Sequence, residues 1–152
     1  MNGLELKIPP PVVALLVGGV MWMAKHAPFL AIPRNIVLLA AATLVLAGFA
    51  IAGAGLISFR RAGTTVHPHR PQETSALVTT GIYRYSRNPM YAGLLLIVVA
   101  WAVYLGSLWA LAGPIVFVLY INRFQIMPEE RVLSAKFGET YVAYRSKVRP
   151  WL

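Results

Sequence analysis

Long apolar stretches alternate with short, mostly basic ones along this chain of 152 residues. No charged side chain occurs between Arg34 and Arg60, and none occurs between Arg87 and Arg123. Uncharged apolar stretches of this length are typical of helices that cross a membrane. The pattern therefore predicts an all-α protein, a polytopic membrane helix bundle that forms a single domain.

The apolar stretches predict about four membrane-spanning helices. A helix over residues 36–59 would be about 36 Å long, which is enough for a hydrocarbon core of about 30 Å. The uncharged stretch after Asn88 would extend about 52 Å as one helix, so Gly106 and Ser107 are expected to turn it into a hairpin. Gly113 and Pro114 are expected to kink its second half. The expected spans are residues 9–24, 36–59, 90–105 and 108–124.

The first expected span has a second interpretation, as a secretory signal peptide. Its start is barely basic, because Glu5 offsets Lys7, and no small-x-small cleavage site precedes Lys25. A membrane helix that stays in the protein is therefore preferred.

Two short helices are predicted in the tail, residues 125–152. Pro128, followed by two glutamates, is typical of a helix start, because proline suits the first position and acids there offset the helix dipole. This helix is expected to end near Phe137 and Gly138. A second, amphipathic helix from Glu139 to about Lys147 is expected to lie at the membrane surface.

The 14 lysines and arginines outnumber the 5 aspartates and glutamates, which gives a formal net charge of +9. In a soluble protein this excess would suggest a nucleic-acid partner. Here the basic side chains gather in the loop 60–88 and in the tail, which the positive-inside rule assigns to the cytoplasm. The charge therefore indicates a topology with both termini cytoplasmic, and no nucleic-acid partner is expected.

The chain has no cysteine, which excludes a disulfide framework, an iron–sulfur site and a cysteine nucleophile. His67 and His69 are spaced like a pair of metal ligands. Two histidines without a third histidine, cysteine or carboxylate close by rarely bind a metal. No metal site is therefore predicted.

Residues 81–93, GIYRYSRNPMYAG, combine three tyrosines and two arginines with an Asn-Pro break, immediately before an apolar stretch. Guanidinium groups bind carboxylate or phosphate as a fork, and tyrosine rings stack on bases. The segment is therefore suited to an anionic ligand that carries an aromatic group. Taken alone, the same residues also fit a positive-inside flank with an interfacial aromatic belt.

Two further motifs are ambiguous when taken singly. Gly53-Ala54-Gly55 is no dinucleotide fingerprint, since no strand precedes it and no third glycine follows, so close helix packing is favoured. Glu129 and Glu130 either offset a helix dipole or bind the hydroxyl or ammonium groups of a ligand.

In this order along the chain, the motifs resemble those of the membrane-embedded methyltransferase superfamily of isoprenylcysteine carboxyl methyltransferase and phosphatidylethanolamine N-methyltransferase. The similarity runs from about Gly53 to Leu152. It depends on the order GxG, Arg-x-Pro-x-Tyr-x-Gly, Glu-Glu, Phe-Gly, Tyr and a terminal Arg-x-Trp. The resemblance implies S-adenosylmethionine as methyl donor, with S-adenosylhomocysteine as product. It also implies a multi-pass protein of a bacterial inner membrane, whose active site faces the cytoplasm.

The resemblance also implies which residues form the site. The phospholipid branch assigns donor binding to the GxG and the glutamate pair, and the isoprenylcysteine branch assigns it to the Arg-x-Pro-x-Tyr segment and to the tail. Asn88 stands where the isoprenylcysteine branch has histidine, whereas the phospholipid branch can carry Asn-Pro-Met-Tyr. Arg87, Tyr91 and Glu130 are the expected catalytic residues. The expected donor-binding residues are Gly53, Gly55, Tyr83, Arg84, Asn88, Pro89, Tyr91, Glu129, Glu130, Tyr141, Tyr144 and Arg145.

Methyl transfer from a sulfonium is an in-line displacement, so the protein chiefly has to align the reacting atoms and exclude water. Arg84 or Arg87 is expected to pair with the carboxylate of the donor, and Tyr91 to pack on its adenosyl or methyl group. Glu130, or Glu129, is expected to hold its ribose or ammonium. An amine, thiol or hydroxyl acceptor would need a base, whereas a carboxylate acceptor would not.

The expected function is that of a methyltransferase for a lipophilic or membrane-associated acceptor that enters from the bilayer, such as an isoprenylcysteine-type carboxylate. Two alternatives stay open: a phospholipid amine N-methyltransferase, and a non-catalytic membrane scaffold of the same fold. A small transporter would need an ionisable residue in the middle of a span, and the sequence has none there. The identity of the acceptor and the oligomeric state do not follow from the sequence.

Overall fold

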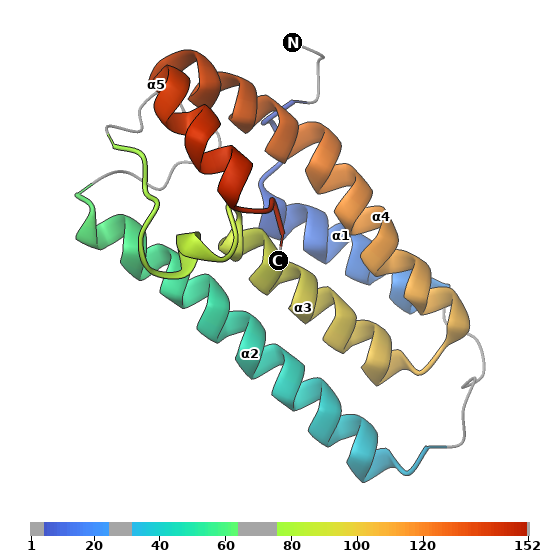
Figure 1. Cartoon of the computed structure of the whole chain (residues 1–152). Coiled ribbons are helices and arrows are strands. Elements are labelled where there is room, and N and C mark those ends of the chain that lie inside the picture. The colour runs from blue at the N-terminus through green and yellow to red at the C-terminus, as the bar shows by residue number, and fades with distance from the viewer. Residues whose placement is uncertain (1–4, 25–31, 64–75, 152) are drawn as a thin grey trace.

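The computed structural model describes residues 5–24, 32–63 and 76–151 of the chain. In these ranges the chain is helical and contains no strand, as predicted (Figure 1). The main helices are α1 (Pro10–Met23), α2 (Arg34–Arg61), α3 (Pro89–Leu105), α4 (Ala112–Ile121) and α5 (Met127–Lys147).

Two helical stretches are long and apolar enough to cross a membrane: Arg34–Arg61 and Leu108–Lys147. The helices Pro10–Met23 and Pro89–Leu105 are apolar but shorter. The four expected spans therefore coincide with helices, and the protein is a helical membrane bundle.

The predicted hairpin turn lies between α3 and α4. Gly106 ends α3 in the left-handed conformation, with φ 62° and ψ 15°, which glycine adopts without a steric penalty. The kink expected at Gly113 and Pro114 is wrong in position, because α4 continues through both residues and the irregular turn, η3 (Leu108–Leu111), precedes them. Pro114 causes no break there because the first N–H groups of a helix have no partner within the helix.

Helices α2 and α3 approach closely at a pair of glycines. A Cβ atom on Gly48 would lie 2.7 Å from the carbonyl oxygen of Gly93, and one on Gly93 would lie 2.5 Å from that of Gly48. Only glycine at both positions allows this separation. The contact holds the middle of α2 beside the first turns of α3, which follow directly on residues 81–88.

Helices α1, α3 and α4 enclose the apolar core, in which Val13, Val98, Phe117 and Ile121 are buried. At the end of the bundle that contains Gly106, a row of stacked rings joins α1 to α3. The ring of Trp101 stacks on those of Trp22 and Tyr104. The guanidinium of Arg34, from α2, lies 4.3 Å from the Tyr104 ring centroid, which adds a cation–π contact.

The chain remains helical from α4 into α5, through the π-helical turn η4 (Asn122–Ile126). The predicted helix start is confirmed as the start of α5 at Met127, with Pro128 in its first turn, but no loop precedes it because the chain before it is already helical. Proline has no N–H with which to bond the carbonyl of Phe124, four residues earlier, yet the helix continues. The backbone N–H of Leu6 donates to that carbonyl instead, at 3.0 Å.

Helix α5 changes direction at Gly138, whose φ of 51° and ψ of −130° are not helical. The predicted boundary between two tail helices is confirmed, because this backbone conformation favours glycine. Tyr141, on the second half, is only 2 % exposed, so this face packs inside the protein. In Figure 1 the bent α5 lies at the end of the bundle where α2 ends and α3 begins.

Candidate active site

The candidate site lies where the segment before α3 meets α5 and the last residues of the chain. Gly81–Arg84 form the short helix η2, and Pro89 occupies the first position of α3, which its fixed φ favours. Ser86 is fully buried and its hydroxyl accepts the backbone N–H of Asn88 at 3.1 Å. This local structure leaves Arg87 in the bend that faces α5.

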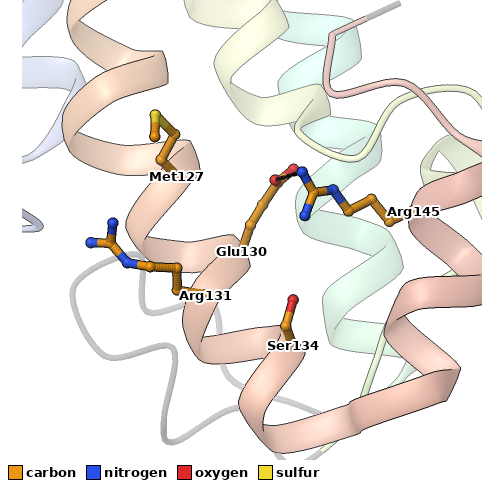
Figure 2. A pocket seen from close by; sticks show the side chains of 5 residues that line it. All are labelled: Met127, Glu130, Arg131, Ser134 and Arg145. Carbon is orange, nitrogen blue, oxygen red and sulfur yellow. Dashed lines mark ion pairs between the residues drawn. The ribbon is translucent and has the colours of Figure 1, made fainter.

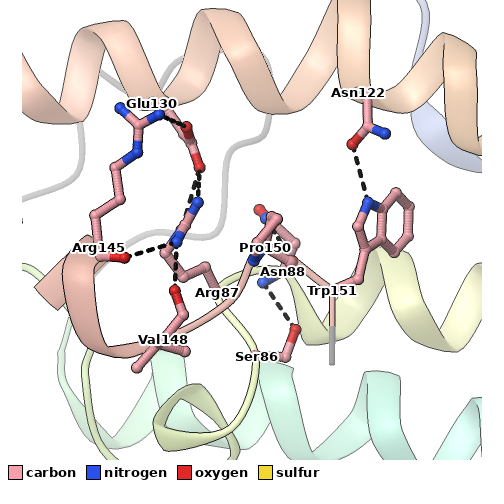
Figure 3. Close-up of polar contacts among 9 residues, drawn as sticks. All are labelled: Ser86, Arg87, Asn88, Asn122, Glu130, Arg145, Val148, Pro150 and Trp151. Atoms are coloured by element: carbon pink, nitrogen blue, oxygen red, sulfur yellow. Dashed lines mark hydrogen bonds and ion pairs between the residues drawn. The ribbon is translucent and has the colours of Figure 1, made fainter.

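Arg87 forms a buried ion pair with Glu130, shown in Figure 3. The Nε and Nη2 atoms of Arg87 donate to Glu130 Oε1 at 3.1 and 2.5 Å. The two side chains are 8 % and 13 % exposed. Arg87 Nη1 also donates to the carbonyls of Arg145, at 3.1 Å, and Val148. The guanidinium therefore ties the segment before α3 to both halves of α5.

Glu129 has a different partner from its neighbour. The Tyr91 hydroxyl, on the first turn of α3, donates to Glu129 Oε1. Successive residues of a helix point roughly 100° apart, so Glu129 faces α3 while Glu130 faces Arg87. The glutamate pair thus engages two residues of the same Arg-x-Pro-x-Tyr segment.

Three predicted tyrosines lie close to this pair. Tyr83 is 6 % exposed, and its backbone carbonyl accepts the Tyr144 hydroxyl at 2.7 Å. Burial raises the pKa of Tyr83 well above its ordinary value, so it is a neutral phenol at physiological pH. A Cβ atom on Gly55 would lie 3.6 Å from the Tyr83 hydroxyl and 2.9 Å from Met90 Cγ, so this glycine lets α2 approach the start of α3. The Tyr141 and Tyr144 rings contact each other edge to face, with centroids 6.3 Å apart.

The last residues of the chain cross the start of α3. The Asn88 side chain donates to the carbonyl of Pro150 at 2.9 Å, and the Arg87 N–H donates to that of Arg149 at 2.9 Å. The Trp151 indole N–H donates to the Asn122 side chain at 2.9 Å. Residues 149–151 are therefore bonded to the start of α3 on one side and to η4 on the other (Figure 3).

A pocket of about 340 Å³ opens beside Glu130, between the two halves of α5 (Figure 2). Its volume lies within the range of small-molecule sites, roughly 300–1,000 Å³. Arg145, which is 55 % exposed, reaches Glu130 Oε2 at 3.5 Å across it. The lining residues are Met127, Glu130, Arg131, Ser134 and Arg145.

Three of these lining residues were not among the predicted site residues. Met127, Arg131 and Ser134 lie three, one and four positions from Glu130 along the sequence. Residues spaced by three, four and seven positions share one face of a helix, so this spacing was the available signal.

Of the predicted residues, Gly53 and Arg84 lie apart from the site contacts. A Cβ atom on Gly53 would meet nothing within 4 Å, and Arg84 is exposed and forms no ion pair within the described ranges.

Within the described part of the chain, no group of three histidine, cysteine, aspartate or glutamate residues is arranged to hold a metal ion. His67 and His69 lie outside the described residues.

The model of the phospholipid methyltransferase family matches residues 36–140. This match covers more than half of the chain and contains Arg87, Tyr91, Glu129 and Glu130. The chain belongs to the phospholipid methyltransferase family. This confirms the resemblance to the wider superfamily, so the protein is a member of a family of membrane-associated methyltransferases.

Two relatives extend this comparison. An uncharacterised protein of Haemophilus influenzae is 52 % identical over 63 residues, which are 41 % of this chain and all of that protein. Protein-S-isoprenylcysteine O-methyltransferase B of Arabidopsis thaliana is 32 % identical over 112 residues, which are 70 % of this chain. This chain covers 54 % of the Arabidopsis protein, about half of its length. No solved structure matches the chain.

Proposed function

We propose that this member of the phospholipid methyltransferase family is a methyltransferase that uses S-adenosylmethionine and acts on a lipophilic or membrane-associated acceptor. One observation carries the proposal. Arg87 and Tyr91, from one motif, contact Glu130 and Glu129, from another motif about 40 positions away. Motifs that share a function need such proximity, whereas two unrelated motifs do not.

The residues around the pocket suit the chemical groups of the donor. The Glu130 carboxylate can accept hydrogen bonds from ribose hydroxyls or from an ammonium group. Arg145 is more than half exposed and its ion pair with Glu130 is long, at 3.5 Å, so it can turn to bind the carboxylate of the donor as a fork. The buried rings of Tyr83 and Tyr141 provide apolar surface beside these charges.

Arg87 has another task in this proposal. Its guanidinium is already engaged by Glu130 and by the carbonyls of Arg145 and Val148. It therefore orients Glu130 and closes the tail over the site. In this proposal Arg145 binds the carboxylate of the donor, and the exposed Arg84 of the loop is the alternative.

When bound, S-adenosylmethionine supplies an electrophilic methyl group on a sulfonium. The protein aligns the acceptor with that methyl group and keeps water away. For an amine acceptor a proton must leave, and the Glu129 carboxylate, hydrogen-bonded to Tyr91, is our candidate for the base that accepts it. A carboxylate acceptor needs no base.

Two acceptors are favoured by different observations. The name of the Arabidopsis relative favours an isoprenylcysteine-type carboxylate, and the family match favours a phospholipid amine. Asn88 supports the second, because it stands where the isoprenylcysteine branch has histidine, whereas the phospholipid branch can carry Asn-Pro-Met-Tyr. We place the site at the cytoplasmic face of a multi-pass protein of the bacterial inner membrane, on the argument of its basic loop and tail.

The test is calorimetric titration of the detergent-purified protein with S-adenosylmethionine and S-adenosylhomocysteine. Wild type should bind both, Glu130→Gln should bind at least roughly tenfold more weakly, and Glu139→Gln should match wild type. Glu139 is the control because it is an exposed acid on the same helix and forms no ion pair within the described ranges. Folded wild type that binds neither ligand would overturn the proposal in favour of a non-catalytic scaffold.

The acceptor is then identified by transfer of a labelled methyl group. One reaction contains a farnesylcysteine analogue in detergent, and the other contains vesicles with phosphatidylethanolamine. Label in the first product supports the carboxylate acceptor, and label in the second supports the phospholipid amine.

A further inference from the structure

The residues before α1 are joined to the tail of the protein, although they lie outside the residues that match the family. The Glu5 carboxylate accepts hydrogen bonds from Arg123 at 2.9 Å and from Arg131 at 2.6 Å. The Gln125 side chain donates to the Ile8 carbonyl at 2.8 Å, which adds to the bond between Leu6 and Phe124. Segments more than 100 positions apart are thus bonded at the π-helical turn, where the helix is irregular.

Glu5 is buried, although its two partners are not. Its side chain is 3 % exposed, whereas those of Arg123 and Arg131 are 41 % and 54 % exposed. A carboxylate is removed from water only at a cost that its partners must offset. The arrangement keeps one negative charge directly beside Arg131, which lines the pocket.

The direction of Arg131 matters for the pocket. Figure 2 shows its guanidinium pointing away from the Glu130 carboxylate, while that of Arg145 points toward it. The Glu5 carboxylate pairs with the Arg131 guanidinium at 2.6 Å. Without Glu5, a free cation would stand at the wall of a pocket that already contains Arg145.

We infer that Glu5 is a positioning residue, which holds Arg131 aside and neutralises it so that the pocket beside Glu130 can receive a cationic ligand. This inference rests on the proposed donor site. S-Adenosylmethionine carries a net positive charge, because its sulfonium adds to a balanced ammonium and carboxylate. S-Adenosylhomocysteine lacks the sulfonium and is neutral overall. An unneutralised Arg131 would therefore oppose the donor more than the product.

The first test compares the Kd values of the two ligands in Glu5→Gln. We expect the ratio of the Kd of S-adenosylmethionine to that of S-adenosylhomocysteine to rise roughly threefold or more, as for one added, partly screened charge. The double variant Glu5→Gln with Arg131→Ala should bring the ratio back to that of wild type. If Glu5→Gln only distorted the pocket, both Kd values would rise by the same factor and their ratio would not change. An unchanged ratio would therefore overturn the inference.

Arg123→Ala is the matched control. Arg123 binds the other oxygen of the same carboxylate, but it does not line the pocket. Glu5 keeps Arg131 in this variant, so the ratio should stay at the wild-type value. A ratio that rises as much as in Glu5→Gln would mean that Arg131 is not the group through which Glu5 acts.

A second measurement needs no ligand, and so it separates this inference from the proposed function. Phenylglyoxal modifies exposed arginines, and peptide mapping gives the rate at each site. Arg131 should react several-fold faster in Glu5→Gln than in wild type, while Arg145, which Glu5 does not contact, should react at the same rate in both. If wild type does not bind S-adenosylmethionine but Arg131 reacts faster in Glu5→Gln, only the proposed function fails. If Arg131 reacts at the same rate in both proteins, the positioning role of Glu5 fails.

Discussion

The guanidinium of Arg87 lies 2.5 Å from the carboxylate of Glu130, although 43 positions separate the two residues. This contact joins the segment before α3 to α5, and it also positions the carboxylate that lines the pocket. Removal of one partner of a buried ion pair leaves the other charge uncompensated. The pair therefore connects the stability of the tail to the chemistry proposed for the site.

Arg87→Ala should lower the free energy of unfolding by about 3 kcal/mol, because Glu130 would lose its short ion pair and keep the longer contact with Arg145. Denaturant titration in a constant detergent concentration measures this change. Arg84→Ala is the control, since Arg84 is exposed three positions away, and its effect should stay within about 0.5 kcal/mol. Equal losses in both variants would contradict the importance of the pair.

Tyr91→Phe should lower the free energy of unfolding by about 1–2 kcal/mol, because the Glu129 carboxylate loses its hydrogen-bond donor. The ring stays in place, so packing changes little. Tyr85→Phe removes a hydroxyl from a residue that is 73 % exposed and should leave stability unchanged. If Tyr91→Phe is as stable as wild type, water or another donor must replace the hydroxyl.

Two glycine substitutions in the same pair of helices should have opposite effects. Gly93→Ala should destabilise by about 1–3 kcal/mol, since its Cβ would lie 2.5 Å from the Gly48 carbonyl. Gly53→Ala should stabilise α2 by about 0.5–1 kcal/mol, because a Cβ there meets nothing within 4 Å and alanine favours a helix. Thermal unfolding in detergent compares them. Gly53→Ala also tests the predicted donor role of this residue, since added bulk at a ligand-contacting glycine would weaken S-adenosylmethionine binding.

Glu5 should make stability depend on acidic pH. The hydrogen bond from Arg123, together with that from Arg131, holds the pKa of the Glu5 carboxyl below its ordinary value of 4.5. The folded pKa is lower than the unfolded one, so the stabilisation is complete above about pH 4.5 and is lost as pH falls through the lowered pKa. Between about pH 5 and pH 3 the Tm of wild type should therefore fall more than that of Glu5→Gln.

The matched variant for this pH series is Glu139→Gln. It removes one titratable carboxyl of the same kind from an exposed position on α5. Its Tm should fall with pH as steeply as that of wild type. A steep fall in Glu5→Gln as well would assign the acid sensitivity to other carboxylates.

Much of the architecture follows from the sequence because its causes are local. Apolar stretches without charges form helices here, and the positive φ angles of Gly106 and Gly138 end α3 and bend α5. Pro128 and the two glutamates after it predict a helix start, and α5 does begin at Met127, but the π-helical turn and the N–H of Leu6 join it to the helix before it. The local sequence around Pro128 does not reveal a hydrogen-bond donor that comes from the other end of the chain.

The contacts of the candidate site were decided by tertiary structure. The sequence places Glu129 and Glu130 next to each other, but only the rotation of α5 against α3 directs one to Tyr91 and the other to Arg87. The bend of α5 at Gly138 brings Arg145 back to Glu130 and forms the pocket. Glu5 reaches Arg131 because α1 packs on α4. Such pairings depend on how whole helices pack, and packing sums many weak contacts that no short stretch of sequence contains.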